Sequence, residues 1–380
     1  MISISRLLCD NIGPGDDLRY GGHKPPIVVW NCTRQCNLHC LHCYADAKSV
    51  CSPEEMSTEE AKIFILGLAE FSVPVLLFSG GEPLLRKDIF ELAAFAKEQG
   101  IRPALSTNGT LINDSVAETL RELGFSEVGI SLDGIEENND RFRGKKGAFE
   151  LALGGIRTCV NKGLRVSLRL TITQFNYRDI PTILQLVENE NIDRVCFYHL
   201  TYSGRGGKLQ DEGLSLEKTR AVVDMICQRT QDFFQRGMTK EILTVDNHAD
   251  GVYLYLKLKQ QTPQRAKKVL ALLKKNGGNN SGIRIGAVDD LGNVHPDQFW
   301  WHYSLGNVLK RKFGDIWMDT EEPLMRGLKN RKGLLKGRCG RCQYLDLCNG
   351  NLRVRAEAVY GDIWAEDPAC YLTDEEIGLV

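Results

Sequence analysis

The segment NCTRQCNLHCLHCYADA (residues 31–47) directly follows the apolar run PIVVWN at 26–31. Its cysteines Cys36, Cys40 and Cys43 have the spacing C-x3-C-x2-C. Thiolates are the usual ligands of iron–sulfur clusters, and three ligands on one short loop leave one iron of a [4Fe–4S] cluster without a protein ligand. A zinc site is the alternative, but zinc sites usually combine paired C-x2-C halves with four local ligands. The spacing therefore predicts an iron–sulfur cluster with one open iron, and we expect Cys32, which does not fit the spacing, to be a buried thiol.

Residues 26–200 repeat one pattern, in which a short β-rich apolar run is followed by an amphipathic helix. Ser57 and Glu60 have the spacing of a helix capping box, and Asp88 is expected to cap the next helix. After Ser57 the apolar positions recur at i, i+3, i+4 and i+7, as on one face of a helix. The predicted strands are PIVVWN (26–31), VLLFSG (75–80), RPALST (102–107), EVGISL (127–132), RVSLRLTI (165–172) and RVCFYHL (194–200).

Six strand–helix units predict an α/β fold, with a parallel sheet, right-handed crossovers and helices on the outside. A partial, three-quarter (β/α)6 TIM-like barrel fits six units better than a closed barrel of eight. Active-site side chains are then expected at the carboxyl ends of the strands. The predicted organisation is an N-terminal extension (1–25), the barrel (26–235), a helical linker (236–280) and a smaller C-terminal iron–sulfur domain (281–380).

The chain has 380 residues, of which 42% are hydrophobic and 26% charged, and its net charge is −1. A net charge this small gives no general attraction to nucleic acid or anionic lipid. The first residues do not resemble a signal peptide, and no apolar run approaches the roughly 18 residues that a membrane span needs. We therefore expect a cytoplasmic protein without nucleic-acid or membrane partners. In a reducing compartment, 13 cysteines favour metal ligation over disulfides.

The cysteine loop, its position after the first strand and the partial barrel resemble the radical S-adenosylmethionine (radical SAM) superfamily. The resemblance implies that Cys36, Cys40 and Cys43 are the catalytic ligands of a [4Fe–4S] cluster. It implies S-adenosylmethionine as cofactor, cleaved by one electron to a 5′-deoxyadenosyl radical. It further implies a reduced ferredoxin or flavodoxin as electron donor.

Residues at the carboxyl ends of the next strands match positions at which the superfamily binds its cofactor. Gly80 and Gly81 would let the backbone approach the methionine moiety, and Glu82 would pair with its ammonium group. Two arginines are candidates for the cofactor carboxylate, and each has a structural or solvent-facing role as the alternative. The implied cofactor-binding residues are Ser79, Gly80, Gly81, Glu82, Asn108, Ser131, Asp133, Arg143 and Arg169.

A second cysteine group resembles the C-terminal SPASM domain of radical SAM enzymes, which can hold two auxiliary [4Fe–4S] clusters. The pattern C-x2-C-x5-C is present, but Asp297 and Leu352 stand where the full pattern has cysteines. The resemblance therefore implies one auxiliary cluster and two [4Fe–4S] clusters in all. The alternatives are a further cluster held with Asp297 or His295, and a structural zinc at the cysteine group. The implied auxiliary ligands are Cys339, Cys342, Cys348 and Cys370.

The run HPDQFWWHYSLGNV (295–308) and the cysteine-rich segment after it resemble the tetrapyrrole-modifying branch of the superfamily. A flat polycarboxylate macrocycle favours aromatic faces and arginine forks. Aromatic faces are expected from Trp300, Trp301, His302 and Tyr303, with packing in a small core as the alternative for the tryptophans. Tyr198 and His199 are expected at the barrel mouth, and His295 is a candidate ligand or proton donor near the substrate. The candidate arginine forks are Arg205, Arg338, Arg341, Arg353 and Arg355.

This resemblance implies removal of two acetate side chains from 12,18-didecarboxysiroheme to give iron–coproporphyrin III. The opening MISISRLLCD, with GDDLRYG (15–21), favours this reaction over replacement of propionates of the same precursor in heme d1 biosynthesis. Peptide modification is another alternative, although only 25 residues precede the first barrel strand. An iron–sulfur electron carrier is the non-enzymatic alternative, but it would not need the cofactor pocket around Glu82.

Overall fold

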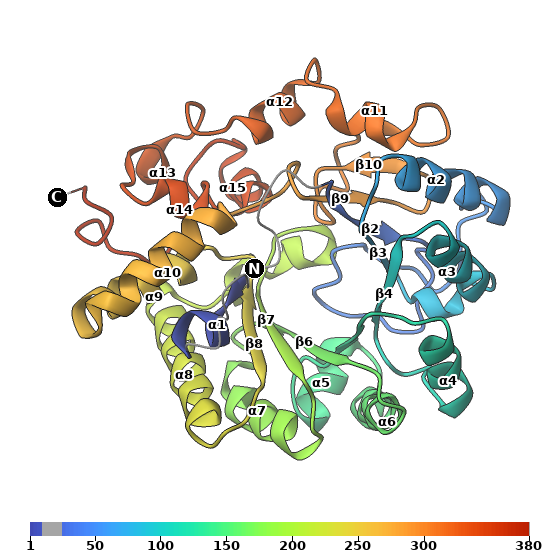
Figure 1. The fold of residues 1–380 in the computed structure, drawn as a ribbon, viewed down its shortest axis with the longest axis horizontal. Coiled ribbons are helices and arrows are strands. Elements are labelled where there is room, and N and C mark those ends of the chain that lie inside the picture. Colours follow the sequence, from blue (N-terminus) through green and yellow to red (C-terminus); the bar gives the residue numbers. More distant parts are fainter. Residues whose placement is uncertain (10–24, 380) are drawn as a thin grey trace.

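The computed structural model describes residues 1–9 and 25–379, and one curved sheet dominates it (Figure 1). The strands β2 to β7 run parallel, each beside its predecessor in sequence. All six predicted strands and the predicted α/β barrel class are confirmed. The strand bounds are β2 (Ile27–Asn31), β3 (Val75–Ser79), β4 (Arg102–Thr107), β5 (Val128–Ser131), β6 (Val166–Ile172) and β7 (Arg194–His199).

Helices between these strands lie on the outside of the sheet (Figure 1). The capping box of the first one is confirmed, because the Ser57 side chain accepts from the Glu60 N–H and the Glu60 carboxylate accepts from the Ser57 N–H. Asp88 does not cap with its side chain, which corrects the prediction: its carboxylate accepts from Arg86 and from the Thr58 hydroxyl instead. The outer helices are α2 (Thr58–Glu70), α3 (Ile89–Glu98), α4 (Asp114–Glu122), α5 (Glu136–Arg143), α6 (Ala148–Asn161), α7 (Ile180–Asn189) and α8 (Leu216–Gln235).

The sheet extends beyond the six predicted strands at both edges. On one side β8 (Glu241–Val245) pairs parallel with β7, and β1 (Ile2–Ser3) pairs antiparallel with β8. The helix α1 (Ile4–Leu8) follows β1 directly. Residues 10–24 of the predicted extension, including GDDLRYG, lie outside the described residues. On the other side β9 (Ile285–Val288) pairs parallel with β2, and β10 (Asn293–His295) and β11 (Gly306–Asn307) continue the sheet.

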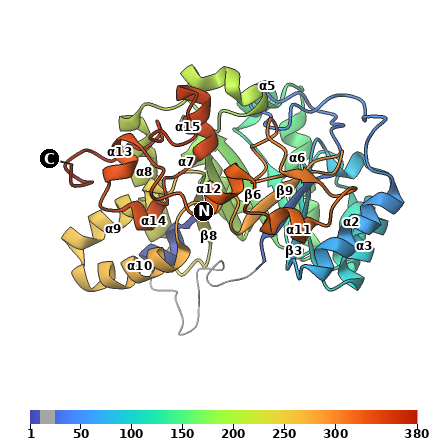
Figure 2. The same ribbon diagram turned by 90° about the horizontal axis from the view of Figure 1, so that it is seen from above.

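The C-terminal segment follows two helices, α9 (Ala249–Gln261) and α10 (Pro263–Asn276). This segment (orange to red in Figures 1 and 2) begins at the β9 edge of the sheet and crosses to the other side of the molecule, where α14 (Leu345–Cys348) contacts α9 and α10. The domain boundaries at residues 235 and 280 stay a prediction, since one sheet runs through the described residues of both parts. Short helices make up the rest: α11 (Phe313–Met318), α12 (Pro323–Lys329), α13 (Gly337–Arg341), α14 (Leu345–Cys348) and α15 (Arg353–Tyr360), with the 3-10 turns η1 (Pro83–Leu85), η2 (Tyr177–Asp179) and η3 (Gly204–Glu212).

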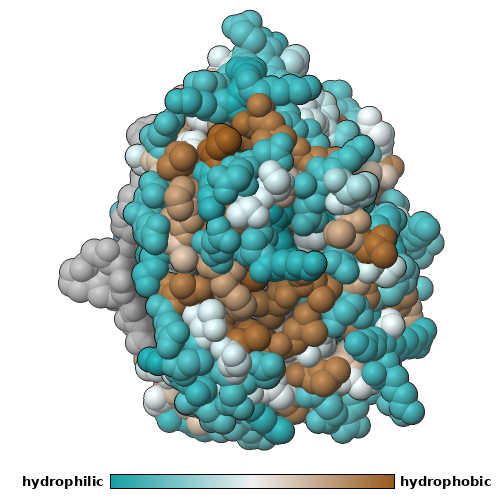
Figure 3. Space-filling model, turned by 90° about the vertical axis from the view of Figure 1, so that its right-hand side faces the viewer, coloured by the Kyte–Doolittle hydropathy of each residue, from teal (hydrophilic) through white to brown (hydrophobic). Residues whose placement is uncertain are grey.

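Strand alternation decides which side chains face the barrel interior. Trp30 of β2 and Phe78 of β3 pack outward, and Trp30 also meets Phe64 of α2. The next residue of each strand, Asn31 and Ser79, therefore points to the interior at the carboxyl end. On the outside, α2 also exposes apolar residues, and Figure 3 shows apolar residues gathered on the face that lies to the right in Figure 1. Among the described helices, none is long and apolar enough to span a bilayer.

Candidate active site

Two loops at the carboxyl ends of β2 and β3 are packed backbone to backbone. The Gly81 N–H donates to the Thr33 carbonyl (2.7 Å), and the Glu82 N–H donates to the Gln35 carbonyl (2.7 Å). A Cβ on Gly80 would lie 2.3 Å from the Thr33 oxygen, and one on Gly81 would lie 2.1 Å from the Gln35 oxygen. The glycines are thus required for contact between the protein's own loops, which the sequence argument had assigned to contact with the cofactor. This contact fixes the start of the cysteine loop.

The three predicted cluster ligands pack together in this loop. Each thiol accepts at least one polar contact: Cys36 from the Leu38 N–H (3.4 Å), Cys43 from the Ala47 N–H (3.4 Å) and Cys40 from Arg143 Nη1 (3.7 Å). Burial raises the pKa of the Cys36 thiol to about 12, so a metal is needed to hold it as a thiolate. Cys32 is fully buried and donates to the Ser79 carbonyl, as predicted for a thiol outside the cluster.

The donor set fits an iron–sulfur cluster, because N–H groups directed at thiolate sulfur stabilise its negative charge. In the described part of the chain, no three His, Cys, Asp or Glu side chains are arranged to hold a single metal ion. The cysteine ligands of an iron–sulfur cluster bind different iron atoms, so their sulfur atoms do not have to converge on one point.

Glu82 lies under the cysteine loop and is 0% exposed. Its carboxylate accepts from the Thr107 hydroxyl (2.7 Å), the Asn108 N–H (2.8 Å) and the Leu84 N–H (3.1 Å). Burial raises the pKa of Glu82 to about 7, against the effect of these three donors. A cationic group at this position would favour the ionised carboxylate. The site is therefore electrostatically suited to an ammonium group.

Asn108 directly follows β4 and connects this strand to the cysteine loop. Its Nδ2 donates to Asn37 Oδ1 (2.8 Å) and lies 3.9 Å from the Cys36 sulfur. Its Oδ1 accepts from the Thr110 N–H (2.9 Å). The loops that follow β3 and β4 therefore both contact the segment around Cys36.

Asp133 and Arg143 were predicted as separate contacts of the cofactor, and the structure pairs them. Arg143 Nη2 lies 2.5 Å from Asp133 Oδ2, and His42 Nε2 lies 3.3 Å from the same oxygen. The His42 ring stacks on Phe142 at 4.5 Å between centroids, and burial lowers its pKa to about 4, so it is neutral. The sequence argument missed His42, although its position between Cys40 and Cys43 was a signal. Arg143 is bound to Asp133 and directed at Cys40, which makes it a support of the cysteine loop.

Ser131 and Arg169 are neighbours in the register of β5 and β6. Arg169 extends across Gly129, whose Cβ would lie 2.2 Å from the guanidinium carbon. Its Nη2 lies 3.5 Å from Glu127, and its buried Nε has no hydrogen-bond partner among the described residues. Arg169 therefore presents an unused donor inside the barrel.

Tyr44 completes the interior edge and was not predicted. Its hydroxyl lies 3.1 Å from both Asn31 Oδ1 and Ser79 Oγ. The ring packs edge-on against Phe299 of the C-terminal segment, with 5.4 Å between centroids. Tyr44 thus joins the end of the cysteine loop to both halves of the fold.

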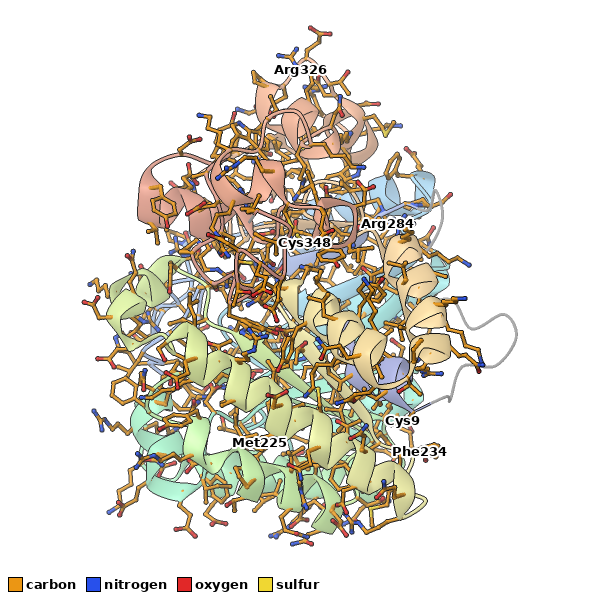
Figure 4. All side chains as sticks on the ribbon, turned by 90° about the vertical axis from the view of Figure 1, so that its left-hand side faces the viewer. Cys9, Met225, Phe234, Arg284, Arg326 and Cys348 are labelled. Carbon is orange, nitrogen blue, oxygen red and sulfur yellow. The ribbon has the colours of Figure 1, made fainter. Side chains whose placement is uncertain are left out.

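The second cysteine group lies in and around α13 and α14. Figure 4 shows Cys348 in the C-terminal segment, and its helix α14 contacts α9 and α10. The other three thiols are close enough to influence the pKa of Cys348, which burial raises. The Tyr344 N–H donates to the Cys342 sulfur (3.3 Å), and the positive charge of Arg353 acts on Cys339. Four thiols with such surroundings fit a fully ligated cluster.

Known proteins resemble this chain over its full length. Residues 30–187 match the family described as the Radical SAM superfamily. The chain is 56% identical over 395 aligned positions to the Fe-coproporphyrin III synthase of Methanosarcina barkeri, covering 100% of this chain and 99% of that protein. The chain belongs to the radical SAM superfamily. The predicted family is thereby confirmed.

Other radical SAM proteins match less closely. The pre-heme d1 synthase of Dinoroseobacter shibae is 42% identical, over 94% of this chain and 89% of that protein. The solved structure of anSMEcpe with bound AdoMet superposes with a TM-score of 0.72 at 20% identity, covering 93% of this chain and 96% of that one. The last likeness shows a shared radical SAM fold that includes the C-terminal segment.

Several residues that were candidates for substrate contact in this radical SAM protein have internal roles. Arg355 pairs with Asp367 through two hydrogen bonds (2.8 and 2.9 Å), and buried Arg353 donates to the carbonyls of Gly350, Ile363 and Ala365. The arginine-fork prediction is wrong for these two. The other three predicted arginine forks differ in their surroundings. Arg205 holds the cysteine loop through the carbonyls of Cys40 and Ala47, Arg338 pairs with Asp374, and Arg341 is exposed.

The aromatic candidates divide in the same way. Trp300 is fully buried in a small core, as the alternative reading predicted, whereas Trp301 is half-buried, with the Arg34 guanidinium 5.3 Å from its ring centroid. His302 pairs with Glu357, and Tyr303 donates to Glu322.

Three further candidates, Asp297, His295 and His199, also contact other side chains or backbone groups of the protein. Asp297 accepts from the Ser281 hydroxyl and the Phe299 N–H, and His295 Nδ1 lies 2.8 Å from the Tyr303 carbonyl. These contacts give both residues a structural role. Tyr198 lies on the Arg169 side of the sheet, toward the barrel interior. His199 points to the opposite side of β7 and binds Asp250 (2.9 Å), which corrects the prediction that it faces the barrel mouth.

Proposed function

We propose that the chain removes two acetate side chains from 12,18-didecarboxysiroheme to give iron–coproporphyrin III. The observation that carries the proposal is the 56% identity, over 100% of this chain and 99% of the relative, to a protein named Fe-coproporphyrin III synthase. The protein named pre-heme d1 synthase is 42% identical, so replacement of propionates is the second candidate. Peptide modification has no comparable support, because three solved structures with a bound peptide are only 18–19% identical to this chain.

The residues of the cysteine and glycine loops form the proposed reaction site. When bound, S-adenosylmethionine with a reduced [4Fe–4S] cluster supplies a 5′-deoxyadenosyl radical that takes hydrogen from carbon. Cys36, Cys40 and Cys43 would hold the cluster, and Glu82 would orient the ammonium group of the cofactor. Arg143 donates to Cys40 and is itself paired with Asp133.

The barrel interior would bind the rest of the cofactor. Ser79, Ser131 and Asn108 lie at adjacent strand ends, and Arg169 carries the unused Nε donor. This donor makes Arg169 a better candidate than Arg143 for the cofactor carboxylate, because the Arg143 guanidinium is neutralised by Asp133. Tyr44 and Phe299 cover the site from the C-terminal side and would limit access of water.

The C-terminal segment would contribute one auxiliary [4Fe–4S] cluster on Cys339, Cys342, Cys348 and Cys370. Trp301, half-buried and with the Arg34 guanidinium 5.3 Å from its ring centroid, is the aromatic side chain best suited to contact the macrocycle. We infer a cytoplasmic protein that receives its electrons from a reduced ferredoxin or flavodoxin.

Anaerobic incubation with 12,18-didecarboxysiroheme, reductant and S-adenosylmethionine tests the proposal. The expected products are iron–coproporphyrin III and 5′-deoxyadenosine, identified by chromatography against authentic standards. The Cys36→Ala variant is the control and should form neither product. Cleavage of the cofactor without change in the macrocycle would exclude the proposed substrate and leave the superfamily assignment intact.

A further inference from the structure

A second polar stretch lines the barrel interior beyond the proposed cofactor pocket. Arg169 of β6 is aligned with Cys196 of β7, and Tyr198 follows Cys196 by two positions, so all three face the interior. Tyr198 is in turn aligned with Val245, the last residue of β8, and Asp246 directly follows Val245. Away from the cofactor pocket, the polar residues therefore run from Arg169 to Tyr198 and then to Asp246, across three neighbouring strands (Figure 1).

Tyr198 presents a hydroxyl group that has no hydrogen-bond partner among the described residues. The side chain is half-buried, and its ring packs against Val245. Burial raises the pKa of Tyr198, with Arg169 and Asp246 among the charged groups close enough to act on it. The phenol therefore keeps its proton, and it is a hydrogen-bond donor for which the described part of the chain supplies no acceptor.

Asp246 is held at the end of β8 by the C-terminal segment. Its backbone lies in the left-handed region (φ 66°), which is uncommon outside glycine and persists where neighbouring contacts fix it. Arg355 Nη2 supplies one such contact by donating to the Asp246 carbonyl (2.9 Å). The next residue, Asn247, supplies another by donating from Nδ2 to the Ala369 carbonyl (2.9 Å). The carboxyl oxygen Oδ2 of Asp246 is nevertheless buried without a hydrogen-bond partner in the parts of the chain that the structure describes.

The Asp246 carboxyl group forms no ion pair with any described residue. The ionisable groups around it are the Met1 amino group, Tyr198, His199, Asp297 and Arg355. All of these groups except Tyr198 are bound to other partners.

The protonation of Asp246 follows from this environment. Burial raises the pKa of Asp246 to about 7, because an unpaired buried charge is costly. Near neutral pH, a large share of the protein therefore carries Asp246 as a neutral carboxyl group. Such a group has a proton to donate. Asp246 and Tyr198 are thus two neighbouring donors at the carboxyl ends of β7 and β8.

We propose that Asp246 and Tyr198 together bind one carboxylate side chain of the substrate at the barrel mouth. A carboxylate has two acceptor oxygens, which match the two donors that lack acceptors within the described residues. Hydrogen bonds to a charged acceptor are stronger than those between neutral groups, so this contact can orient a macrocycle. The inference rests on the proposed function, because it takes the substrate to be a polycarboxylate tetrapyrrole.

Binding measurements on the anaerobically reconstituted protein test this site. The variants are Tyr198→Phe, Asp246→Ala and Asp246→Asn, the last of which keeps a donor but cannot ionise. Tyr177→Phe and Asp193→Asn are the matched controls, because the Tyr177 ring lies beside Lys218 of the outer helix α8 and Asp193 is exposed directly before β7. The affinities for 12,18-didecarboxysiroheme and iron–coproporphyrin III are measured from the absorbance of the macrocycle, and the affinity for S-adenosylmethionine is measured by calorimetry.

Tyr198→Phe and Asp246→Ala should each bind 12,18-didecarboxysiroheme roughly tenfold more weakly or worse, since each loses one hydrogen bond to a charged acceptor. The affinity of the unaltered protein should fall as pH rises through the Asp246 pKa of about 7, because the ionised carboxylate repels the substrate. Asp246→Asn should bind within about threefold of the unaltered protein at low pH and lose this pH dependence. The controls should bind as the unaltered protein does. Every variant should retain its affinity for S-adenosylmethionine, which also shows that it is folded.

Iron–coproporphyrin III identifies which carboxylate is bound. It lacks the two acetates and keeps the propionates, so equal losses with this product indicate a propionate, and losses with the substrate alone indicate an acetate. Unchanged affinity for both macrocycles in Tyr198→Phe and Asp246→Ala, equal losses in the controls, or weaker binding of S-adenosylmethionine instead would overturn the inference. An unaltered protein that binds neither macrocycle would overturn both this inference and the proposed function. The expected losses of affinity without removal of acetates by the unaltered protein would overturn the proposed function alone.

Discussion

Glu82 is a buried carboxylate whose three hydrogen-bond donors all come from its own protein. If it also binds the cofactor ammonium, Glu82→Gln keeps the shape and removes the charge. We expect S-adenosylmethionine to bind roughly ten- to a hundredfold more weakly, which corresponds to about 1.5–3 kcal/mol for a charged hydrogen bond. Anaerobic calorimetry on the reconstituted protein measures this affinity, and iron content should not change.

The exposed Glu59→Gln serves as the control, since Glu59 lies on the outer surface of α2. A lower melting temperature with unchanged cofactor affinity would make Glu82 a structural residue that only ties the ends of β3 and β4 together.

From the sequence, candidate site residues could be found where a cysteine spacing or a position at a predicted strand end pointed to them. Cys36, Glu82 and Asn108 do lie together, because the carboxyl ends of parallel strands meet at one edge. Tyr44 had no such mark, and the position of His42 between two cluster cysteines was overlooked, because the partners of both side chains come from other strands or from α5. Arg353 and Arg355 were assigned wrongly because a sequence does not show the carbonyls and the Asp367 carboxylate that bind them.

At the scale of elements, the cysteine and glycine loops act as one unit. Gly81→Ala places a methyl group where the Gln35 carbonyl stands, and backbone cannot yield as a flexible side chain does. We expect a loss of about 2–4 kcal/mol in the free energy of unfolding, with a lower yield of the cluster. Urea unfolding and iron analysis measure the two effects.

Gly67→Ala is the matched control, because no atom lies within 4 Å of the added methyl group on α2. It should be neutral or stabilise the protein by up to about 1 kcal/mol. Equal stability of the two variants would show that the cysteine loop and the glycine loop can move apart without loss of stability, which would contradict this prediction.

The strands of the barrel were predictable where they form long β-rich runs followed by amphipathic helices. β8 was missed because EILTV is short and follows a charged helix, so that only its pairing with β7 and β1 reveals it. Likewise, β9 joins the edge at β2 by a parallel pairing that spans most of the chain. Such long-range pairings leave little trace in local sequence patterns.

At the scale of the whole molecule, one group of thiols follows β2, and the other lies in and around α13 and α14, beside α9 and α10. Anaerobic reconstitution should yield about eight iron and eight sulfide per chain, from two [4Fe–4S] clusters. Replacing Cys36, Cys40 and Cys43 together by Ala should halve both contents and abolish cofactor cleavage. About twelve irons in the unaltered protein would require a third cluster and contradict the structural role of Asp297.

The second thiol group should matter for turnover more than for cofactor cleavage. Cys342→Ser removes one auxiliary ligand and leaves the loop at Cys36 unchanged. We expect 5′-deoxyadenosine to form at a similar rate, while conversion of the tetrapyrrole falls at least tenfold. Parallel quantification of both products in one reaction checks this, and equal loss of both would assign the group a role in folding.

The central claim is that this radical SAM protein acts on the acetates of its tetrapyrrole. Mass spectrometry of the macrocycle after anaerobic turnover of 12,18-didecarboxysiroheme tests it most directly. We predict a product that has lost two acetate groups and retains every propionate, with the mass of iron–coproporphyrin III. A product that retains its acetates and has lost propionates would contradict the claim and favour the reaction of heme d1 biosynthesis.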